Sequence, residues 1–314
     1  MAVDLSIDLI QATVQVEQPL GDGTRTVGTG FLISDPTPDG KPRTILVTAN
    51  HVFRKMPGPI ATIGFRIENA DGSWRYAPEP LKIRDGHREL WTHHPNRDVA
   101  VIEIEAPPAF AKAALPESTL ADDDTFVKEQ LGPGDEMLAL GFPEGLSANA
   151  AGFPILRSGR VASFPLAPSK AFPTFLLDFR VFPGNSGGPV YVDGPPHPQP
   201  VVATEARAEP KPRGLGGVFG HFGGLFAHAD TRQPDTPALV QAPARRGFIA
   251  GLLTQQVELN SQNLSIGIVT DAKFVRETLS LLDDPKVALS TPELAEKGAP
   301  TPGLISAMDA AYSR

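Results

Sequence analysis

The sequence predicts an all-β protein made of two β-rich halves, with one helix near the C-terminal end. Short apolar or alternating runs recur along the chain, and clusters of Gly, Pro, Asn and Asp separate them. A content of 33 Pro and 30 Gly favours a loop-rich β fold. Sustained helical periodicity is convincing in one place only, residues 271–282. Together these observations are typical of a barrel or sandwich.

Six strands are expected in the first half. The N-terminal stretch MAVDLSIDLIQATVQVEQ alternates and is interpreted as a strand. Turn-forming stretches such as DPTPDGKP, NADGS and IRDGH separate the later runs. The expected strands are residues 10–18, 26–33, 43–49, 61–68, 87–93 and 98–105.

A connector rich in Pro and Ala, residues 106–133, leads to the second half. Residues 193–245 interrupt that half with no sustained strand or helix period, and a loop this long is normally functional or disordered. The helix follows, with Asp271 as its N-cap and Phe274, Val275, Leu279 and Leu282 on one face. The expected strands of this half are residues 135–142, 154–164, 173–182, 189–192, 247–256 and 264–270.

The composition excludes several classes of protein. A net charge of −8 gives no basic face for nucleic acid or anionic lipid. No run approaches the roughly 18 apolar residues of a membrane helix. The N-terminus lacks the basic region of a signal peptide, and there are no cysteines for disulfides or thiol chemistry. We therefore expect a cytoplasmic protein that binds neither nucleic acid nor membrane.

A serine nucleophile is suggested by FPGNSGGPVY, residues 182–191, in which three glycines surround Ser186. A serine hydroxyl needs a base, a group that orients the base, and donors for the developing oxyanion. His51 stands at the end of the apolar run ILVTA, and Asp98 opens the run DVAVIEI. Both positions let a side chain reach a cleft from an anchored backbone. Gly184 N–H and Ser186 N–H are the candidate oxyanion donors.

His51, Asp98 and Ser186, in that chain order and with these flanking residues, resemble the catalytic residues of the trypsin/chymotrypsin family of serine endopeptidases. The resemblance is greatest to the bacterial HtrA (Deg) type. The resemblance extends over residues ~9–282 and includes GTGFLI, TANHV, DVAVIEI, GFPEG, SGRVASF, FPGNSGGPV and SIGIVTDAKFVRETL. It implies two six-stranded antiparallel β-barrels, at about residues 9–108 and 130–282, within a protease domain of residues 1–282. Residues 283–314 then form a C-terminal tail.

The resemblance also implies a mechanism. His51 would act as general base and then general acid, Asp98 would orient it, and Ser186 would form an acyl-enzyme. The fold of this family usually places the residue at position 180 at the floor of the primary specificity pocket, where Arg180 would attract an acidic P1 side chain. The favoured alternative for Arg180 is a salt bridge with Asp178 or plain solvent exposure. The substrate backbone would add as a strand beside Leu253, Thr254 and Gln255. No metal or cofactor is implied.

Three features depart from the family pattern. No PDZ segment is recognisable after residue 282, so trimerisation and peptide-activated regulation are not carried over. Asn185 stands where trypsin-like zymogens have aspartate, so activation by a new N-terminus is not expected. The segment 193–245 is longer than this hairpin usually is. We expect 193–245 or the tail to restrain the site or to receive an activating or inhibitory protein partner.

Two other interpretations are less favoured. The sequence GNSGG around Ser186 also fits the G-x-S-x-G nucleophile elbow of α/β-hydrolases. However, the following GGPVYV cannot begin the helix that this fold requires after the serine. His93 and His94 are adjacent and chelate poorly, so surface histidines near the cleft are favoured over a zinc site. Two functional alternatives remain open beside a protease that acts on a protein or peptide substrate. One is a latent or non-hydrolytic binder, and the other is a protease that cleaves only itself within 193–245.

Overall fold

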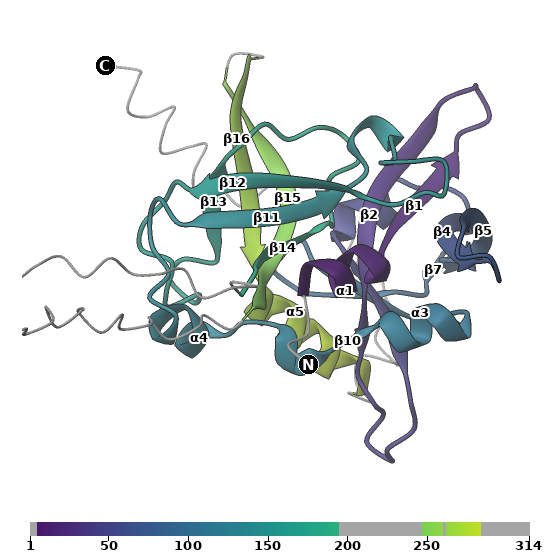
Figure 1. Cartoon of the computed structure of the whole chain (residues 1–314), viewed down its shortest axis with the longest axis horizontal. Coiled ribbons are helices and arrows are strands. Elements are labelled where there is room, and N and C mark those ends of the chain that lie inside the picture. Colours follow the sequence, from purple (N-terminus) through teal and green to yellow (C-terminus); the bar gives the residue numbers. More distant parts are fainter. Residues whose placement is uncertain (1–4, 195–246, 260–261, 284–314) are drawn as a thin grey trace, which may run out of the picture.

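The structure is a computed structural model that describes residues 5–194, 247–259 and 262–283. The predicted strand–loop organisation is confirmed: the chain is mostly β, with two β-rich halves side by side (Figure 1). The predictions for residues 195–245 and for the tail from 284 onward lie outside the described residues. Within the described part, no helix has the length and apolar composition needed to span a bilayer.

The N-terminal half is an open sheet, not the barrel that was predicted. Its strand order is β5-β4-β1-β2-β3-β9-β8, with β10 paired to β2. The two edges cannot close on each other because β8 has two residues, and most of β5 is exposed and carries prolines and charges. The bounds are β1 Thr13–Pro19, β2 Arg25–Ser34, β3 Thr44–Thr48, β4 Ile60–Glu68, β5 Trp74–Lys82, β8 Thr92–His93, β9 Ala100–Ile104 and β10 Leu115–Pro116; the separate hairpin is β6 Arg84–Asp85 with β7 Arg88–Glu89.

The C-terminal half is a closed six-stranded barrel, as predicted, in the order β11-β12-β13-β16-β15-β14. The pair β14 with β11 closes the ring. The long strands β15 and β16 carry a bulge near Leu253 that shifts their register. The bounds are β11 Glu136–Gly141, β12 Ile155–Val161, β13 Thr174–Asp178, β14 Pro189–Val192, β15 Phe248–Leu259 and β16 Gln262–Asp271.

The helices include one that was predicted and several that were not. Helix α5, Ala272–Ser280, has Asp271 as its N-cap, as predicted, and the Asp271 side chain accepts a hydrogen bond from Lys273 N–H. The N-terminal residues interpreted as strand instead form α1, because Leu5, Leu9 and Ala12 lie on one buried face at helical spacing. The other short helices are α2 Asn50–Arg54, α3 Pro108–Ala113, α4 Asp123–Lys128, η1 Glu117–Thr119, η2 Pro143–Gly145 and η3 Leu281–Asp283.

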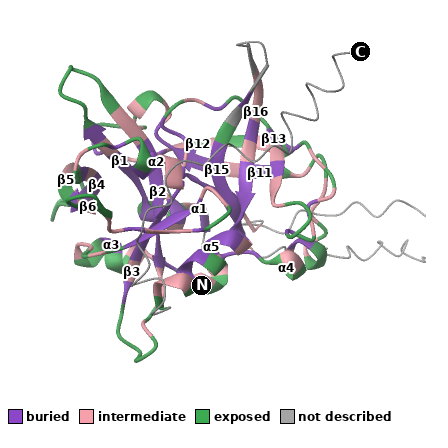
Figure 2. Ribbon diagram, turned by 180° about the vertical axis from the view of Figure 1, so that it is seen from behind, coloured by how far each residue is buried: buried purple, intermediate pink, exposed green. Residues whose placement is uncertain are grey.

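One hydrophobic core runs through both halves. Figure 2 shows buried residues concentrated along β2, β15 and α5, while exposed residues gather at the hairpin loops. Phe31 and Ile45 of the open sheet and Tyr191 and Val269 of the barrel belong to the same buried cluster. The shared core holds the two halves against each other, and therefore fixes the loops that meet at their junction.

Candidate active site

His51 and Asp98 meet at the end of the open sheet. His51 lies in α2, directly after β3, and Asp98 lies two residues before β9. Both oxygens of the Asp98 carboxylate accept from His51: Oδ1 from the backbone N–H at 2.9 Å, and Oδ2 from ring Nδ1 at 2.6 Å. The backbone donor is available because the first N–H groups of a helix have no partner within it. Asp98 therefore fixes both the backbone and the ring of His51.

This pairing also fixes the tautomer of His51. An ionised carboxylate has no proton to donate, so the proton of the pair lies on Nδ1. The other ring nitrogen, Nε2, is then the acceptor of a neutral imidazole. His51 is thereby prepared to take a proton at Nε2.

Ser186 lies on a segment that hydrogen-bonds to both halves of the protein. Its carbonyl accepts from Thr29 N–H of β2 at 2.9 Å, and Gly187 N–H donates to Leu253 O of β15 at 2.7 Å. A Cβ at Gly187, which has φ +88°, would lie 2.1 Å from Thr29 O. Glycine at 187 is therefore required by close packing against the strands that lead to His51.

No hydrogen bond joins the hydroxyl of Ser186 to His51 among the described residues. Within the described ranges the hydroxyl donates to Thr254 O at 3.2 Å. Of the three residues predicted to act together, His51 and Asp98 are joined by hydrogen bonds, and Ser186 is held by the barrel strand β15.

The residues before Ser186 form a type II turn. Asn185 N–H donates to Phe182 O at 3.1 Å, proline occupies the second position, and Gly184 in the third has φ +92°. The carbonyl of Pro183 accepts from Glu144 N–H at 2.7 Å. The 183–184 peptide is not among the cis bonds, so Gly184 N–H points away from Glu144.

The two predicted oxyanion donors are unpaired in the backbone. Neither Gly184 N–H nor Ser186 N–H donates to a backbone acceptor among the described residues. Gly184 is buried, and buried N–H groups are normally paired. An N–H that is held in one orientation and left without an acceptor is suited to bind an oxygen that arrives with a substrate.

Thr29 fixes this turn from the opposite half of the molecule. Its hydroxyl donates to Gly184 O at 2.7 Å and accepts from Phe142 N–H at 3.1 Å. A Cβ at Gly184 would lie 2.2 Å from Phe142 O, so no side chain fits there. The role of Thr29 was not predicted from the sequence, although Thr29 lies in the stretch GTGFLI.

The three residues predicted to pair with substrate lie on β15. Leu253 and Thr254 are buried and Gln255 is exposed. Leu253 uses both backbone groups in the barrel, since its N–H donates to Gly188 O and its carbonyl accepts from Gly187 N–H. Beyond Leu252, β15 pairs with β16 but with no residue of β14. Thr254 and Gln255 therefore have one side without a strand partner in the described part of the chain.

Arg180 is exposed and forms no ion pair with Asp178 among the described residues. Its guanidinium stacks on Phe182 at 4.9 Å, and that of Arg157 stacks on the same ring at 5.2 Å. Arg157 also donates to the carbonyl of Arg180. Burial, together with the charge of Arg180, lowers the pKa of Arg157. Two like charges thus flank the residue that begins the turn before Ser186.

The interpretation of His93 and His94 as surface histidines is wrong for His94, which is 9% exposed. Asn96 N–H donates to its Nδ1 at 3.1 Å, so the proton lies on Nε2, which faces Glu277 Oε2 at 3.1 Å. Packing against Phe274 of α5 buries the ring. Across the described ranges, no three His, Asp or Glu side chains gather as a metal site.

A comparison with protein families agrees with this fold. The profile of the family described as "Trypsin-like peptidase domain" matches residues 28–194, more than half of the chain. No curated protein matches. Similar solved structures include a variant of the HtrA-type protease AlgW with a tripeptide, at 15% identity and TM-score 0.48, covering 91% of this chain and 64% of that one. AlgW with a tripeptide is 16% identical with a TM-score of 0.47, and the match covers 88% of this chain and 62% of that one. AlgW with a decapeptide is 15% identical with a TM-score of 0.46, and the match covers 90% of this chain and 68% of that one. The chain thus spans less than two thirds of the length of the first two structures.

Proposed function

The chain belongs to the family of trypsin-like peptidase domains, and from this premise we propose that it is a serine endopeptidase. The observation that carries the proposal is the rigid turn at residues 182–185, whose unpaired Gly184 N–H stands beside Ser186. The two hydrogen bonds from His51 to Asp98 also support the proposal, because they orient the side chain that would act as the general base.

In the proposed reaction, Ser186 Oγ attacks the carbonyl carbon of the scissile peptide while His51 Nε2 takes its proton. His51 then gives that proton to the leaving amine, and an acyl-enzyme remains. Water hydrolyses the ester by the same route, with His51 again acting as base. Asp98 keeps the proton of neutral His51 on Nδ1 and stabilises the imidazolium that forms in each step.

The backbone of the turn stabilises the tetrahedral intermediates. Gly184 N–H and Ser186 N–H would donate to the oxyanion, and each such donor contributes about 3–4 kcal/mol to lowering the barrier. The donors cost little reorganisation because Glu144 and Thr29 already hold the carbonyls on either side of Gly184.

The hydroxyl of Ser186 must turn from Thr254 O toward His51 before attack. A rotation about the Cα–Cβ bond redirects the hydroxyl without moving the backbone of residues 184–188. Catalytic hydrogen bonds are often absent or long before substrate binds. An extended substrate that donates an N–H to Thr254 O would displace the hydroxyl, so substrate binding itself would release Ser186.

The same observation favours a second candidate, a latent site that binds peptides without cleaving them until a partner acts. In that case the Ser186–Thr254 hydrogen bond is the resting state and not a step of the cycle. The two candidates differ in whether the purified protein reacts with an electrophile that targets activated serines.

Labelling by a fluorophosphonate probe tests this difference on the full chain. We expect time-dependent labelling of the wild type, none of Ser186→Ala, and at most slow labelling of His51→Ala. Ser158→Ala, at an exposed position of β12, is the matched control and should label as the wild type does. A folded wild type that fails to label would exclude an active triad in the isolated chain and favour the latent candidate.

A further inference from the structure

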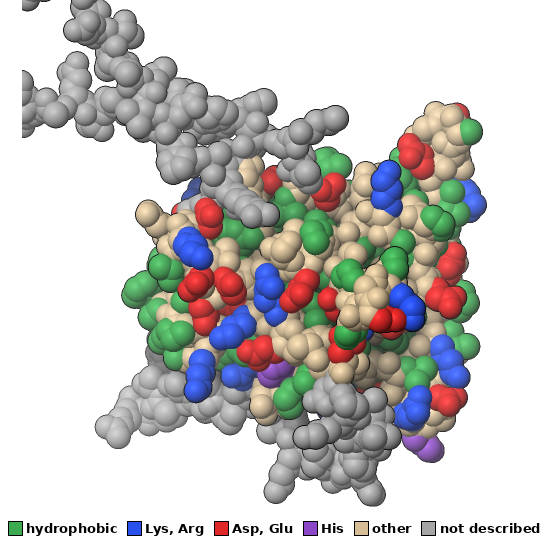
Figure 3. All heavy atoms as spheres, turned by 90° about the horizontal axis from the view of Figure 1, so that it is seen from below, with side chains coloured by type: hydrophobic (Ala, Val, Ile, Leu, Met, Phe, Trp, Pro, Cys, Tyr) green, Lys and Arg blue, Asp and Glu red, His purple; other side chains and the backbone are tan. Residues whose placement is uncertain are grey.

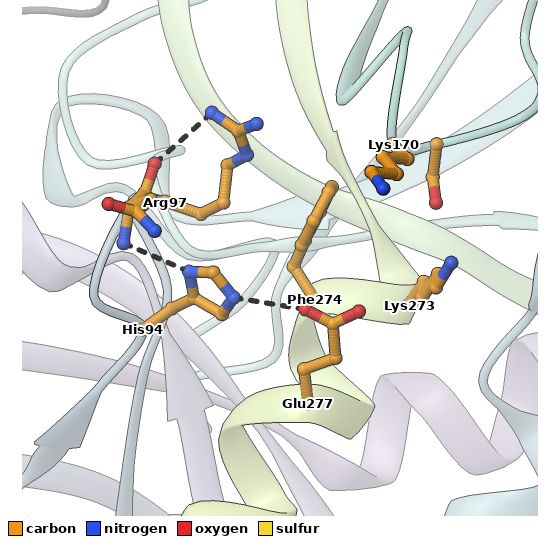
Figure 4. A pocket seen from close by; sticks show the side chains of 8 residues that line it. His94, Arg97, Lys170, Lys273, Phe274 and Glu277 are labelled. Atoms are coloured by element: carbon orange, nitrogen blue, oxygen red, sulfur yellow. Dashed lines mark hydrogen bonds and ion pairs between the residues drawn. The ribbon is translucent and has the colours of Figure 1, made fainter.

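A small cavity of about 250 Å³ lies where α5, the loop before β9 and the loop between β12 and β13 meet. Figure 4 shows its lining, with Arg97 on one side of the Phe274 ring and Lys170 and Lys273 on the other. The cavity volume equals that of several water molecules, and it is below the roughly 300–1,000 Å³ of drug-sized ligand sites. Its size therefore suits one compact chemical group.

Three cationic side chains and a single carboxylate line this cavity. Arg97 stacks over Phe274 at 5.0 Å and, among the described residues, donates one hydrogen bond, to Asn96 O at 3.2 Å. Neither Arg97 nor Lys170 is in a salt bridge among the described residues. Lys273 lies 3.1 Å from Asp123, and this hydrogen bond raises the pKa of Lys273 and keeps its ammonium charged.

The carboxylate, Glu277, is directed to His94. The His94 ring is neutral with its proton on Nε2, and it lies 3.1 Å from Glu277. This hydrogen bond satisfies part of the carboxylate and draws it toward the wall of the cavity (Figure 4). The remaining lining is dominated by positive charge.

The lining also holds two buried donors. Ser169 is fully buried, its N–H donates to Asp123 at 2.7 Å, and its hydroxyl interacts with the same carboxylate and helps to lower the pKa of Asp123. Arg97 Nε is buried and has no partner within the described chain. A buried N–H without a partner is costly, so Arg97 Nε is expected to be satisfied by a ligand.

We propose that this cavity is a binding site for a phosphate group. Three cations from separate segments, with the unpaired Arg97 Nε and the nearby Ser169 hydroxyl, match the charge and the three acceptor oxygens of a phosphate better than the single charge of a carboxylate. Figure 3 shows acidic and basic side chains interspersed over the face that carries α4 and α5. The site therefore fits one compact anion and not an extended polyanion.

Titration calorimetry of the full chain tests the site, with inorganic phosphate as the probe at constant ionic strength. The Ser186→Ala protein is used throughout, so the result does not depend on whether the chain is a protease. We expect saturable binding at one site. Lys170→Gln removes a cation that is in no salt bridge among the described residues, and Ser169→Ala removes the buried hydroxyl. Each variant should weaken binding about tenfold or more, as for loss of a charge-assisted hydrogen bond.

Lys82→Gln is the matched control, because Lys82 is an exposed lysine in the other half, where it pairs with Asp85. The Lys82→Gln protein should bind phosphate as the parent protein does. Glycerol phosphate, run in parallel, separates two sources of the group: tighter binding of the ester identifies a phosphorylated small molecule, and tighter binding of inorganic phosphate identifies the free ion. Binding that is not saturable, that is unchanged in both cavity variants, or that acetate matches would overturn the proposal.

Discussion

The hydroxyl of Thr29 donates a 2.7 Å hydrogen bond to the carbonyl oxygen of Gly184, and this bond joins the open sheet to the turn before Ser186. Thr29 is fully buried, and its own carbonyl accepts from Thr48 Oγ1 at 2.6 Å. The bond lies at the junction of the two halves. The 184–185 peptide, which follows Gly184 in the turn, is therefore held by a residue of the half that carries His51.

Removing that hydroxyl should impair catalysis more than substrate binding. For Thr29→Val we expect kcat to fall about 10- to 100-fold with little change in KM, because the turn loses its support while the substrate contacts remain. Phe142 N–H would also lose its buried acceptor, at a cost of about 1–3 kcal/mol in the free energy of unfolding. Steady-state hydrolysis of a fluorogenic peptide and urea unfolding measure both effects.

Thr29→Ser keeps the hydroxyl and should retain most of the activity. Thr26→Val changes a partly buried threonine at the start of the same strand and is the control for a general effect on β2. If Thr29→Val lowered stability but left kcat unchanged, Thr29 would be a packing residue only.

The arginine pair around Phe182 makes a prediction about substrate preference. Because no carboxylate pairs with Arg157 or Arg180 among the described residues, we expect peptides with Glu or Asp before the scissile bond to be preferred. Arg157→Gln and Arg180→Gln should each lower kcat/KM for these peptides by about tenfold and leave neutral peptides unaffected, as for loss of one charged contact.

A peptide series that differs only at that position measures this preference. Arg160→Gln is the matched control, because Arg160 is on the same strand as Arg157 but hydrogen-bonds to Gly134 O instead. Equal losses for acidic and neutral peptides would show that the two arginines support the fold and do not select substrate.

Local patterns made part of this structure predictable. Asp271 and the apolar face of α5 lie within one short segment, and the chain order of His51, Asp98 and Ser186 needs no knowledge of distances. The contact between Thr29 and Gly184 spans 155 positions, so no local pattern predicts it. The open edge of the first sheet depends on pairing between remote strands in the same way.

Other misses came from local patterns that were ambiguous. The stretch that forms α1 satisfies both an alternating and a helical pattern, and packing of Leu5 and Leu9 decides between them. Strand β5 was missed because Pro78 and Pro80 are unfavourable in strands except at an edge, which is where β5 lies. The sequence around His94 is polar and predicted an exposed side chain, but Phe274 of the remote helix α5 packs against the ring and buries it.

Arg66 is predicted to be essential for stability. It is 1% exposed and lies between the rings of Phe110 and Phe153, at 5.0 and 4.8 Å. Burial lowers its pKa to about 10, so it stays charged at neutral pH. Its guanidinium donates to the carbonyl oxygens of Ile10, Gln11, Thr13 and Gly152.

Arg66→Met should therefore lower the free energy of unfolding by about 3–5 kcal/mol, because the carbonyls at the end of α1 lose their donors. Arg66→Lys keeps a charge but cannot reach several acceptors at once, so we expect it to be destabilised as well. Arg75→Met, an exposed position on β5, should change stability by less than about 0.5 kcal/mol. A loss below about 1 kcal/mol for Arg66→Met would contradict this account.

Asp271 gives the protein a pH-dependent stability. Its carboxyl is 1% exposed, and burial raises its pKa from 3.8 to about 7, with Asp123 adding to the rise and Lys273 opposing it. The folded state thus binds a proton more tightly than the unfolded state. The contribution to stability is complete below pH ~4 and is lost as the pH rises through about 7, by about 4 kcal/mol in total.

Asp271→Asn tests this assignment because asparagine keeps the N-cap acceptor for Lys273 N–H but does not titrate. Between pH 5 and 8 the wild type should lose about 2–3 kcal/mol relative to Asp271→Asn. Urea unfolding of both proteins at several pH values measures the difference, and groups that titrate equally in both cancel. A difference that stays constant across this range would mean that Asp271 does not take up a proton on folding.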